Sequence, residues 1–190
     1  MNNLIVHNDK SVFSLKKMTL ASMFASITIV MSFISIPLPF SPVPITGQTF
    51  ALMLSGSLLD PITSLFSMII YLALGAVGIP VFAGFHGGIS ILLGPTGGYL
   101  LAMPIASFVI SLLTRIADTS FFKLILANII GGILIVYALG VLQLSVVAGL
   151  EIKKAVLLGA VPYILGDLIK VLISSYLSLK LRPVLKMYKD

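Results

Sequence analysis

The stretch Ala155 to Leu179, AVLLGAVPYILGDLIKVLISSYLSL, contains only two charged residues in 25 positions. A helix of about 20 apolar residues is long enough to cross the hydrocarbon core of a bilayer. The two charges, Asp167 and Lys170, lie in the middle of the stretch. A charge at that depth costs at least about 2.5–3.5 kcal/mol, so it is kept only where it faces protein or water. The stretch therefore predicts a transmembrane helix with a polar face turned away from lipid.

Five further uncharged runs precede this stretch. They are Met18–Ile36, Gln48–Leu59, Ile62–Val77, Tyr99–Leu113 and Leu124–Leu142. The 190 residues are 58% hydrophobic and 9% charged, whereas soluble proteins are about 45–50% apolar and about 25% charged. The sequence predicts an all-α integral membrane protein with six transmembrane helices. Residues 1–190 would form a single membrane domain, because six spans leave no room for a soluble one.

The cations gather on one side of this six-helix arrangement. The tails and even-numbered loops hold nine of the 12 Lys and Arg residues, whereas the opposite side holds Lys153 and Lys154. Cytoplasmic loops are enriched in Lys and Arg. We therefore expect both termini in the cytoplasm, with a tail over residues 1–17, a six-helix bundle over residues 18–180 and a basic tail over residues 181–190.

Two unusual connections would then lie on the outer side. Residues 37–44, PLPFSPVP, include four prolines, which exclude helix and favour a fixed, extended loop. Residues 75–98 include eight of the 16 glycines. Irregular backbone at membrane depth is tolerated only where it packs in protein or lines a cavity. We expect the two connections to form a lid over a binding site.

Asp167 and Lys170 are three residues apart, which places both side chains on one helix face, and Tyr163 and Ser174 extend this face. A carboxylate accepts from N–H groups and an ammonium donates to a carbonyl oxygen. The pair therefore complements a compact solute that shows both groups, such as a cyclic urea or amide. An ion pair that only holds helices together is one alternative. A proton relay is another, but the other predicted spans contain no further ionisable Asp, Glu, Lys, Arg or His.

Neutral polar residues are weaker candidates for the same cavity. Asn128 lies in the fifth predicted span, and Thr46 and Gln48 lie at the start of the second. Such side chains in transmembrane helices also bond to neighbouring helices. Tyr99 opens the fourth predicted span, where its ring would either wall a pocket or anchor the helix at the interface.

Small residues mark the first predicted span. Ala21 and Ala25 are four apart, with Ser22 and Ser26 beside them. This ridge lets another helix approach closely, and it serves either internal packing or the docking of a partner subunit.

Several classes of function are disfavoured. The chain has no cysteine, and His86 has no second ligand at metal-binding spacing, so we predict no metal site. No G-x-x-x-x-G-K-[ST] loop is present, and any ATP-driven work would be done by another chain. The cations are scattered at the ends of apolar runs, which indicates a lipid bilayer and not nucleic acid as their partner.

Four strings of the sequence occur together: SPVPITGQTF (41–50), GAVGIPVFAGF (75–85), GPTGGY (94–99) and VPYILGDLIK (161–170). In this order and spacing they resemble the BioY family, the biotin-specific S components of energy-coupling factor (ECF) transporters, over residues from about 18 to 182. The resemblance implies a multi-pass cell-membrane subunit without a cofactor, which binds biotin from outside. It also implies assembly with a transmembrane scaffold subunit and two ATPase subunits.

The resemblance also implies roles for particular residues. Asp167 and Lys170 match the family's intramembrane Asp-x-x-Lys, and Ala21 with Ala25 match the A-x-x-x-A face that meets the scaffold. The chain departs from the family at Gln143 and Met103, where aromatic residues are expected.

Three alternatives remain open. The chain would be an S component for a different vitamin, a solitary biotin transporter, or a small intramembrane transferase. A transferase needs a nucleophile or an acid/base and metal cluster, and Asp167 and Lys170 form the only ionisable pair in the predicted spans. We therefore expect a binding subunit and not an enzyme.

Overall fold

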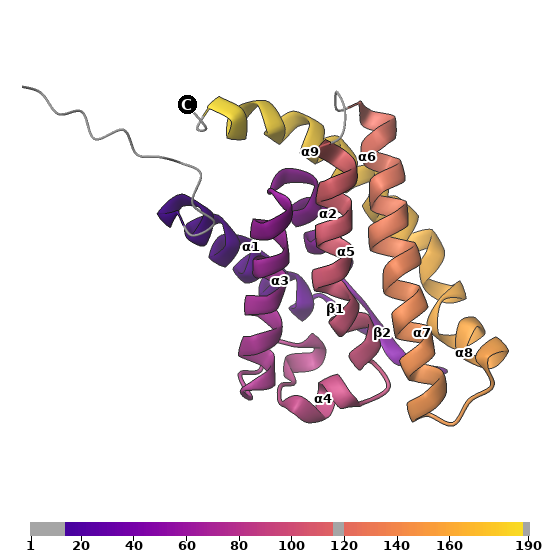
Figure 1. Cartoon of the computed structure of the whole chain (residues 1–190). Helices are drawn as coiled ribbons and strands as arrows, with labels where there is room; N and C mark the ends of the chain where they lie inside the picture. Colours follow the sequence, from indigo (N-terminus) through magenta and orange to yellow (C-terminus); the bar gives the residue numbers. More distant parts are fainter. Residues whose placement is uncertain (1–13, 116–119, 188–190) are drawn as a thin grey trace, which may run out of the picture.

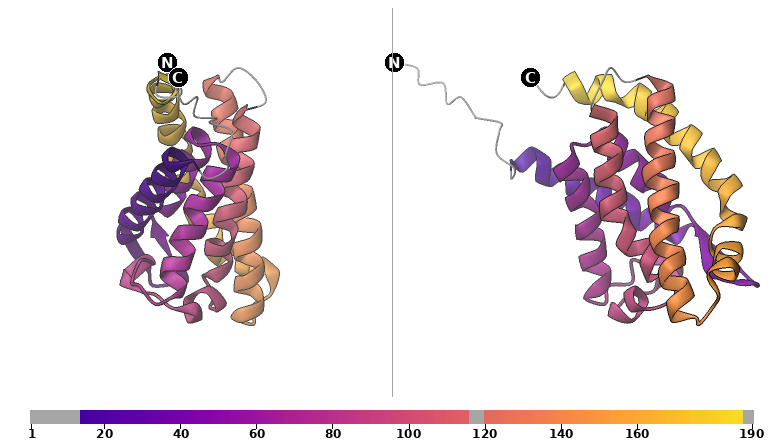
Figure 2. Two further views of the ribbon diagram at one scale, coloured as in Figure 1. Left: turned by 60° about the vertical axis from the view of Figure 1, so that its left-hand side comes forward. Right: turned by 45° about the vertical axis from the view of Figure 1, so that its right-hand side comes forward.

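The protein is a bundle of helices that carries one β-hairpin (Figures 1 and 2). The computed structural model describes residues 14–115 and 120–187. Its elements in chain order are α1 (Leu15–Phe33), β1 (Ser35–Leu38), β2 (Ser41–Thr46), α2 (Gln48–Leu58), α3 (Pro61–Ala76), the 3-10 turn η1 (Ala83–Phe85), α4 (Ile89–Leu93), α5 (Gly97–Arg115), α6 (Phe121–Asn128), the π-helix η2 (Ile129–Ile135), α7 (Val136–Val147), α8 (Ile152–Gly159), the 3-10 turn η3 (Val161–Tyr163) and α9 (Ile164–Met187).

Within the residues that the structure describes, three helical stretches are long and apolar enough to cross a membrane. They are Gly97–Arg115, Phe121–Val147 and Ile152–Pro183. The other helices are shorter or less apolar: α1 has 19 residues, α3 has 16 and α2 has 11, and a perpendicular span takes about 20. The protein is therefore mostly helical, with helices suited to a bilayer.

The break between α2 and α3 lies where the sequence predicts it. Pro61 is the first residue of α3, a position where a missing N–H costs nothing. Asp60 caps this helix: its Oδ1 accepts from the Thr63 N–H at 3.2 Å and its Oδ2 from the Thr63 hydroxyl at 2.6 Å. Burial on its own would raise the pKa of Asp60, but these hydrogen bonds and the charges of Lys17 and Arg115 hold it below its usual value.

The last two predicted spans are less regular than expected. The fifth continues from α6 to α7 but contains the π-helix η2. The sixth was expected as one helix, and this is corrected: α8 ends at Gly159, η3 follows, and α9 begins at Ile164. Pro162 explains the break, because proline lacks an N–H and clashes with the preceding turn of a helix.

The proline-rich connection is a β-hairpin, which corrects the all-α prediction. Strands β1 and β2 pair antiparallel, with Ser35 opposite Thr46 and Ile36 opposite Ile45, and an irregularity follows Ile36. A sheet of two strands has only edges, where proline is tolerated. The hairpin leads directly from α1 into α2 (Figure 1).

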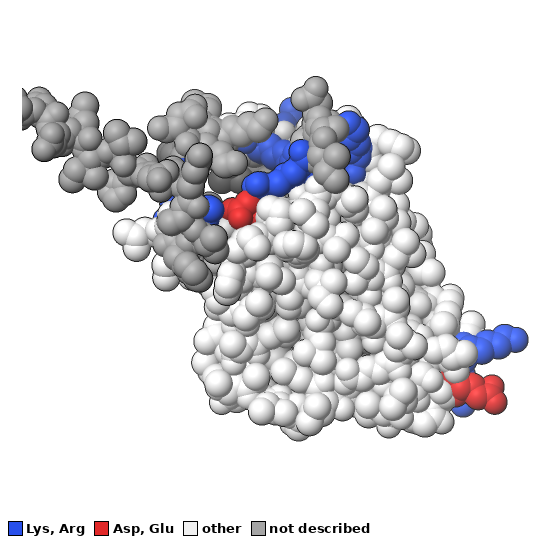
Figure 3. All heavy atoms as spheres, in the orientation of Figure 1, with Lys and Arg blue, Asp and Glu red and all other residues white. Residues whose placement is uncertain are grey.

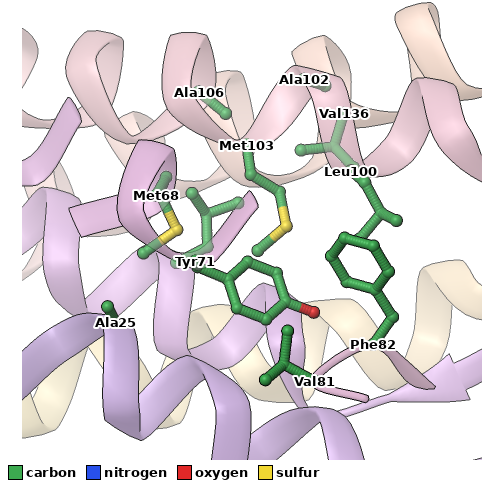
Figure 4. Close-up of a cluster of buried hydrophobic side chains, with 11 residues drawn as sticks. Ala25, Met68, Tyr71, Val81, Phe82, Leu100, Ala102, Met103, Ala106 and Val136 are labelled. Carbon is green, nitrogen blue, oxygen red and sulfur yellow. The ribbon is translucent and has the colours of Figure 1, made fainter. Parts of the chain in front are cut away.

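The largest buried cluster lies among α1, α3 and α5 and includes the segment before η1 (Figure 4). The rings of Tyr71 and Phe82 meet edge to face, with centroids 5.5 Å apart. Phe82 packs so closely on Gly75 that a Cβ there would lie 2.0 Å from its ring. Because Gly75 has no side chain, the loop that carries Phe82 folds back onto the bundle.

Ala21 and Ala25, which the sequence assigns to either internal packing or docking, lie in the interior of this subunit. They are 3% and 1% exposed, and Ala25 lies within the cluster of Figure 4. The exposed face of the same helix instead carries Thr19, Ser22 and Ser26. The ridge of alanines therefore serves the close packing of α1 on α3.

Charged side chains lie toward two ends of the molecule, and the surface between them is uncharged in the view of Figure 3. One end holds Lys17 and Arg115 near Asp60. Arg182 joins this end, where it donates to the Ser57 carbonyl at 2.7 and 2.9 Å. Figures 1 and 2 show α1 beginning and α9 ending on this side. The expected N-terminal tail lies mainly outside the described residues, which leave out 1–13 and 188–190. Most of the expected tail over residues 181–190 instead continues α9, which runs to Met187.

Candidate functional site

A cavity of about 720 Å³ opens beneath the hairpin. It is enclosed by β1, β2, the loop around η1, the first half of α5, the start of α7 and the start of α9. Cavities that hold small molecules usually measure about 300–1,000 Å³. Apolar side chains form much of the wall, among them Phe82, Leu100, Met103 and Val136.

Asp167 and Lys170 lie together in the wall of this cavity. Lys170 Nζ is 2.6 Å from Asp167 Oδ1, as their spacing on one helix face predicts. The two side chains differ in exposure: Lys170 is 20% exposed and Asp167 is 4% exposed. The ammonium therefore faces the cavity, and the carboxylate lies behind it.

The Lys170 ammonium and both Asp167 carboxylate oxygens have hydrogen-bond partners within the protein. Lys170 also donates to the Thr46 carbonyl at 2.7 Å and to the Thr49 hydroxyl at 3.0 Å. Thr49 donates in turn to Asp167 Oδ1 at 3.0 Å, and Tyr137 donates to Asp167 Oδ2 at 2.6 Å. The three protons of the ammonium and both carboxylate oxygens are thus bonded within the protein.

Gln48 and Thr46 also line the cavity, as expected. The Thr46 hydroxyl donates to Gln48 Oε1 at 2.9 Å, and Gln48 Nε2 donates to the Tyr71 hydroxyl. Tyr71 is fully buried. This chain of bonds fixes the start of α2, and with it Thr49, relative to the core.

Two tyrosines fix the outer wall. Tyr99 lines the cavity with its ring and donates its hydroxyl to the Gly159 carbonyl at 2.8 Å. The Tyr163 hydroxyl shares its proton between the Val43 carbonyl and Ser41 Oγ, so η3, directly before α9, also holds the hairpin. The hairpin is fixed a second time where the Ser41 hydroxyl donates to the Leu158 carbonyl at 2.9 Å.

Asn128 does not reach the cavity, which corrects its expected position. It is 0% exposed, accepts from Ser57 and donates to Ser174 and Ser175. Its amide therefore joins α6 to α2 and α9. Ser174 belongs to this buried group and not to the cavity, so the expected polar face of α9 divides between two surroundings.

The two connections expected to form a lid both border the cavity. Residues 37–44 lie in the hairpin, and Phe82 to His86 line the opposite rim. The ring of Phe85 stacks on Phe33 at the end of α1, with centroids 4.5 Å apart. Farther along, Gln143 donates to the carbonyls of Leu92 and Gly94 at 2.8 Å, which ties α7 to this loop.

Thr49 and Tyr137 are the polar partners that sequence reasoning missed. Both are neutral, and nothing in their local pattern separates them from ordinary helix residues. Thr49 follows Gln48 directly, and Tyr137 is the only tyrosine in the fifth predicted span. Within residues 14–115 and 120–187, no group of three or more His, Cys, Asp or Glu side chains could hold a metal ion.

Comparisons with known proteins agree with this architecture. The sequence model of the BioY family matches residues 5–187. A biotin transporter BioY from Thermotoga maritima is 39% identical over 170 residues, which cover 90% of this chain and 98% of that protein. A probable biotin transporter BioY from Pyrococcus horikoshii is 41% identical over 155 residues, which cover 82% of this chain and 89% of that protein.

A solved structure is similar over nearly the whole length. It is the crystal structure of the S component for biotin from an ECF-type ABC transporter, with a TM-score of 0.85 and 28% identity. The likeness covers 96% of this chain and 95% of that chain. By the matched family model and by these relatives, the chain belongs to the BioY family.

Proposed function

We propose that this chain is the biotin-binding S component of an ECF-type transporter, and that it captures biotin from outside for uptake driven by partner subunits. The names of the relatives support this substrate. The single observation that carries the proposal is the Asp167–Lys170 pair in the wall of an otherwise largely apolar cavity. The chain acts by binding and not as an enzyme, and it uses no cofactor.

The chemistry of biotin suits this cavity. Its ureido ring has two N–H donors beside a carbonyl oxygen, and its thiophane ring and valeryl chain are apolar. Lys170, the more exposed partner, donates to the ureido carbonyl, and Asp167 accepts from an N–H. The apolar part of biotin lies against Phe82, Leu100 and Met103. Binding therefore exchanges internal hydrogen bonds of the pair for bonds to the ring.

Other residues of the cavity support this arrangement. Thr46 and Gln48 border the ring site, and Tyr99 forms the outer wall. The hairpin and the loop around η1 close over bound biotin as a lid. Asn128 has no place in this site, since its polar atoms bond to α2 and α9.

The proposed topology is a single domain of six helical passes in the cell membrane, with both termini cytoplasmic. The end that holds Lys17, Arg115 and Arg182 faces the cytoplasm, in agreement with the enrichment of cations there. The end near Lys153 and the cavity mouth then face outward. Residues 1–17 and 181–190 form the tails.

The proposed partners are a transmembrane scaffold subunit and two ATPase subunits, because the chain has no phosphate-binding loop of its own. The docking face that Ala21 and Ala25 mark on α1 is part of this proposal, although both side chains are buried within the subunit. An S component for a different vitamin and a solitary biotin transporter remain the alternatives within transport, and a small intramembrane transferase is the alternative outside it.

Isothermal titration of the detergent-purified chain against a panel of vitamins tests the proposal. We expect biotin to bind saturably and the other vitamins not to bind. If another vitamin bound saturably and biotin did not, that vitamin would be the substrate in place of biotin. Incubation with labelled biotin tests the enzymatic alternative, since recovery of a chemically altered product would contradict a binding role.

A further inference from the structure

A second hollow lies on the outside of the bundle, in the groove between α7 and α8. Its volume is about 440 Å³, and it is lined by Tyr137 and seven aliphatic side chains. Leu134 at the end of η2 and Leu142 on α7 mark its ends, and eight residues of helix correspond to about 12 Å. The groove is therefore a slot along the helix and not an extension of the biotin cavity.

The groove is open to the surroundings of the protein. Leu134 and Leu142 are 58% and 55% exposed, and Ile152 and Val156 on α8 are 53% and 40% exposed. The α7 side belongs to Phe121–Val147, one of the stretches suited to a bilayer. An apolar slot in such a surface favours an apolar occupant, and in a membrane the abundant one is a lipid acyl chain.

Cations border one end of the groove. Lys153 and Lys154 follow Ile152 at the start of α8, and both are exposed. Figure 3 shows this charged group projecting from the end of the molecule where α8 lies. Neither lysine forms an ion pair with Glu151 or with any other described residue. Ile152 lines the end of the groove and the two lysines follow it directly, so ammonium groups on long side chains near this end complement a phosphate head group above its acyl chain.

We propose that this groove binds an anionic phospholipid, with one acyl chain along α7 and the head group at Lys153 and Lys154. The bound chain packs on the outer side of the Tyr137 ring, which lines both the groove and the biotin cavity. The hydroxyl of that ring donates to Asp167 at 2.6 Å. The lipid thus supports the ring that orients the carboxylate.

Native mass spectrometry of the detergent-purified chain, titrated with phosphatidylglycerol or phosphatidylcholine, tests the lipid site without biotin. We expect preferential binding of one phosphatidylglycerol. Each lysine should contribute about fivefold to this affinity, so Lys153→Gln/Lys154→Gln should weaken it by up to about thirtyfold. Lys180→Gln, which removes an exposed cation at the opposite end, should leave it unchanged.

Groove-filling variants test the position of the acyl chain. Ala138 lines the groove, and Ala138→Leu should lower phosphatidylglycerol binding, whereas Ala148→Leu at the end of α7 should not. Equal binding of the two lipids, or equal binding by the parent chain and the lysine double variant, would overturn the proposal. So would a dimer that forms in place of the lipid adduct, because a second copy would then cover the groove.

The link through Tyr137 rests on the proposed biotin function and has its own test. Biotin affinity is measured in nanodiscs of phosphatidylglycerol and of phosphatidylcholine. We expect about fivefold tighter binding in phosphatidylglycerol, and loss of this difference in Lys153→Gln/Lys154→Gln. Equal affinities in both lipids would refute the link. Absence of biotin binding in both would refute the proposed function and leave the lipid titration standing.

Discussion

The Tyr137 hydroxyl lies 2.6 Å from Asp167 Oδ2, the carboxylate oxygen that Lys170 does not bond. Lys170 and Thr49 hold Oδ1, so the carboxylate is fixed from two helices besides its own. Tyr137 orients this group without carrying a charge.

Tyr137→Phe is expected to weaken biotin binding by about three- to tenfold. The ring remains, but one hydrogen bond to the carboxylate is lost, and such a bond contributes about 1 kcal/mol or more. Isothermal titration measures the effect. Tyr176→Phe on the exposed face of α9 is the matched control and should bind like the parent chain. Equal affinity of both variants would show that Tyr137 has no orienting role.

Asp167→Asn and Lys170→Met should each reduce biotin affinity by about ten- to a hundredfold, because each removes a hydrogen bond to a charged group worth about 1.5–3 kcal/mol. Each single change also leaves its partner buried without a counter-charge and should lower the unfolding temperature. The double variant should regain stability but not affinity. A stable double variant that binds biotin like the parent chain would place the site elsewhere.

Ala25→Trp should destabilise the protein, since Ala25 is 1% exposed and has no space for a larger side chain. Ser22→Trp lies on the exposed face of the same helix and should fold and bind biotin normally. Thermal unfolding and size-exclusion profiles in detergent compare the two. Normal stability of Ala25→Trp would contradict the orientation of α1.

Single cysteines in this cysteine-free chain test the proposed topology. In intact cells, an impermeant thiol reagent should label His86→Cys and Lys153→Cys, which lie toward the proposed outer end. Lys180→Cys should react only after the membrane is opened. Labelling of Lys180→Cys in intact cells would reverse the orientation of the bundle.

Acid should weaken the end that holds Asp60. The pKa of this carboxyl is held below its usual value, so its stabilising contribution is present above about pH 4 and is lost as pH falls further. Unfolding temperatures at pH 7 and pH 3 should differ less in Asp60→Asn than in the parent chain. Asparagine keeps the helix cap, so an unchanged difference would show that Asp60 does not contribute.

The site residues that could be predicted were those that stand out as rare in the sequence. Two charges within an apolar stretch identified Asp167 and Lys170, because a buried charge has few physical explanations. Thr49 and Tyr137 could not be found in this way, since a neutral hydroxyl acquires its partner only when distant segments meet. For the same reason the position of Asn128 could not be predicted, because its amide suits a cavity and a helix contact equally well.

The sequence also did not predict which way the first helix turns its alanines, or that the proline-rich connection forms paired strands. The spacing of Ala21 and Ala25 shows that a helix can approach closely, but not whether that helix comes from the same chain. The four prolines of residues 37–44 indicate an extended loop but not its pairing into strands. A two-stranded hairpin accommodates them because each strand has a free edge.

Because Lys170 and Asp167 already bond to each other and to Thr46 and Thr49, ligand recognition at the proposed site is an exchange of hydrogen bonds. A ligand therefore forms its hydrogen bonds to the pair in place of the bonds to Thr46 and Thr49, so the net gain is smaller than the full strength of the new bonds. Molecules that cannot reproduce both the donor and the acceptor lose this competition against the protein itself. At the proposed site, the polar pair would thus set which molecules can bind, and contact with the apolar wall would set how long a bound molecule stays.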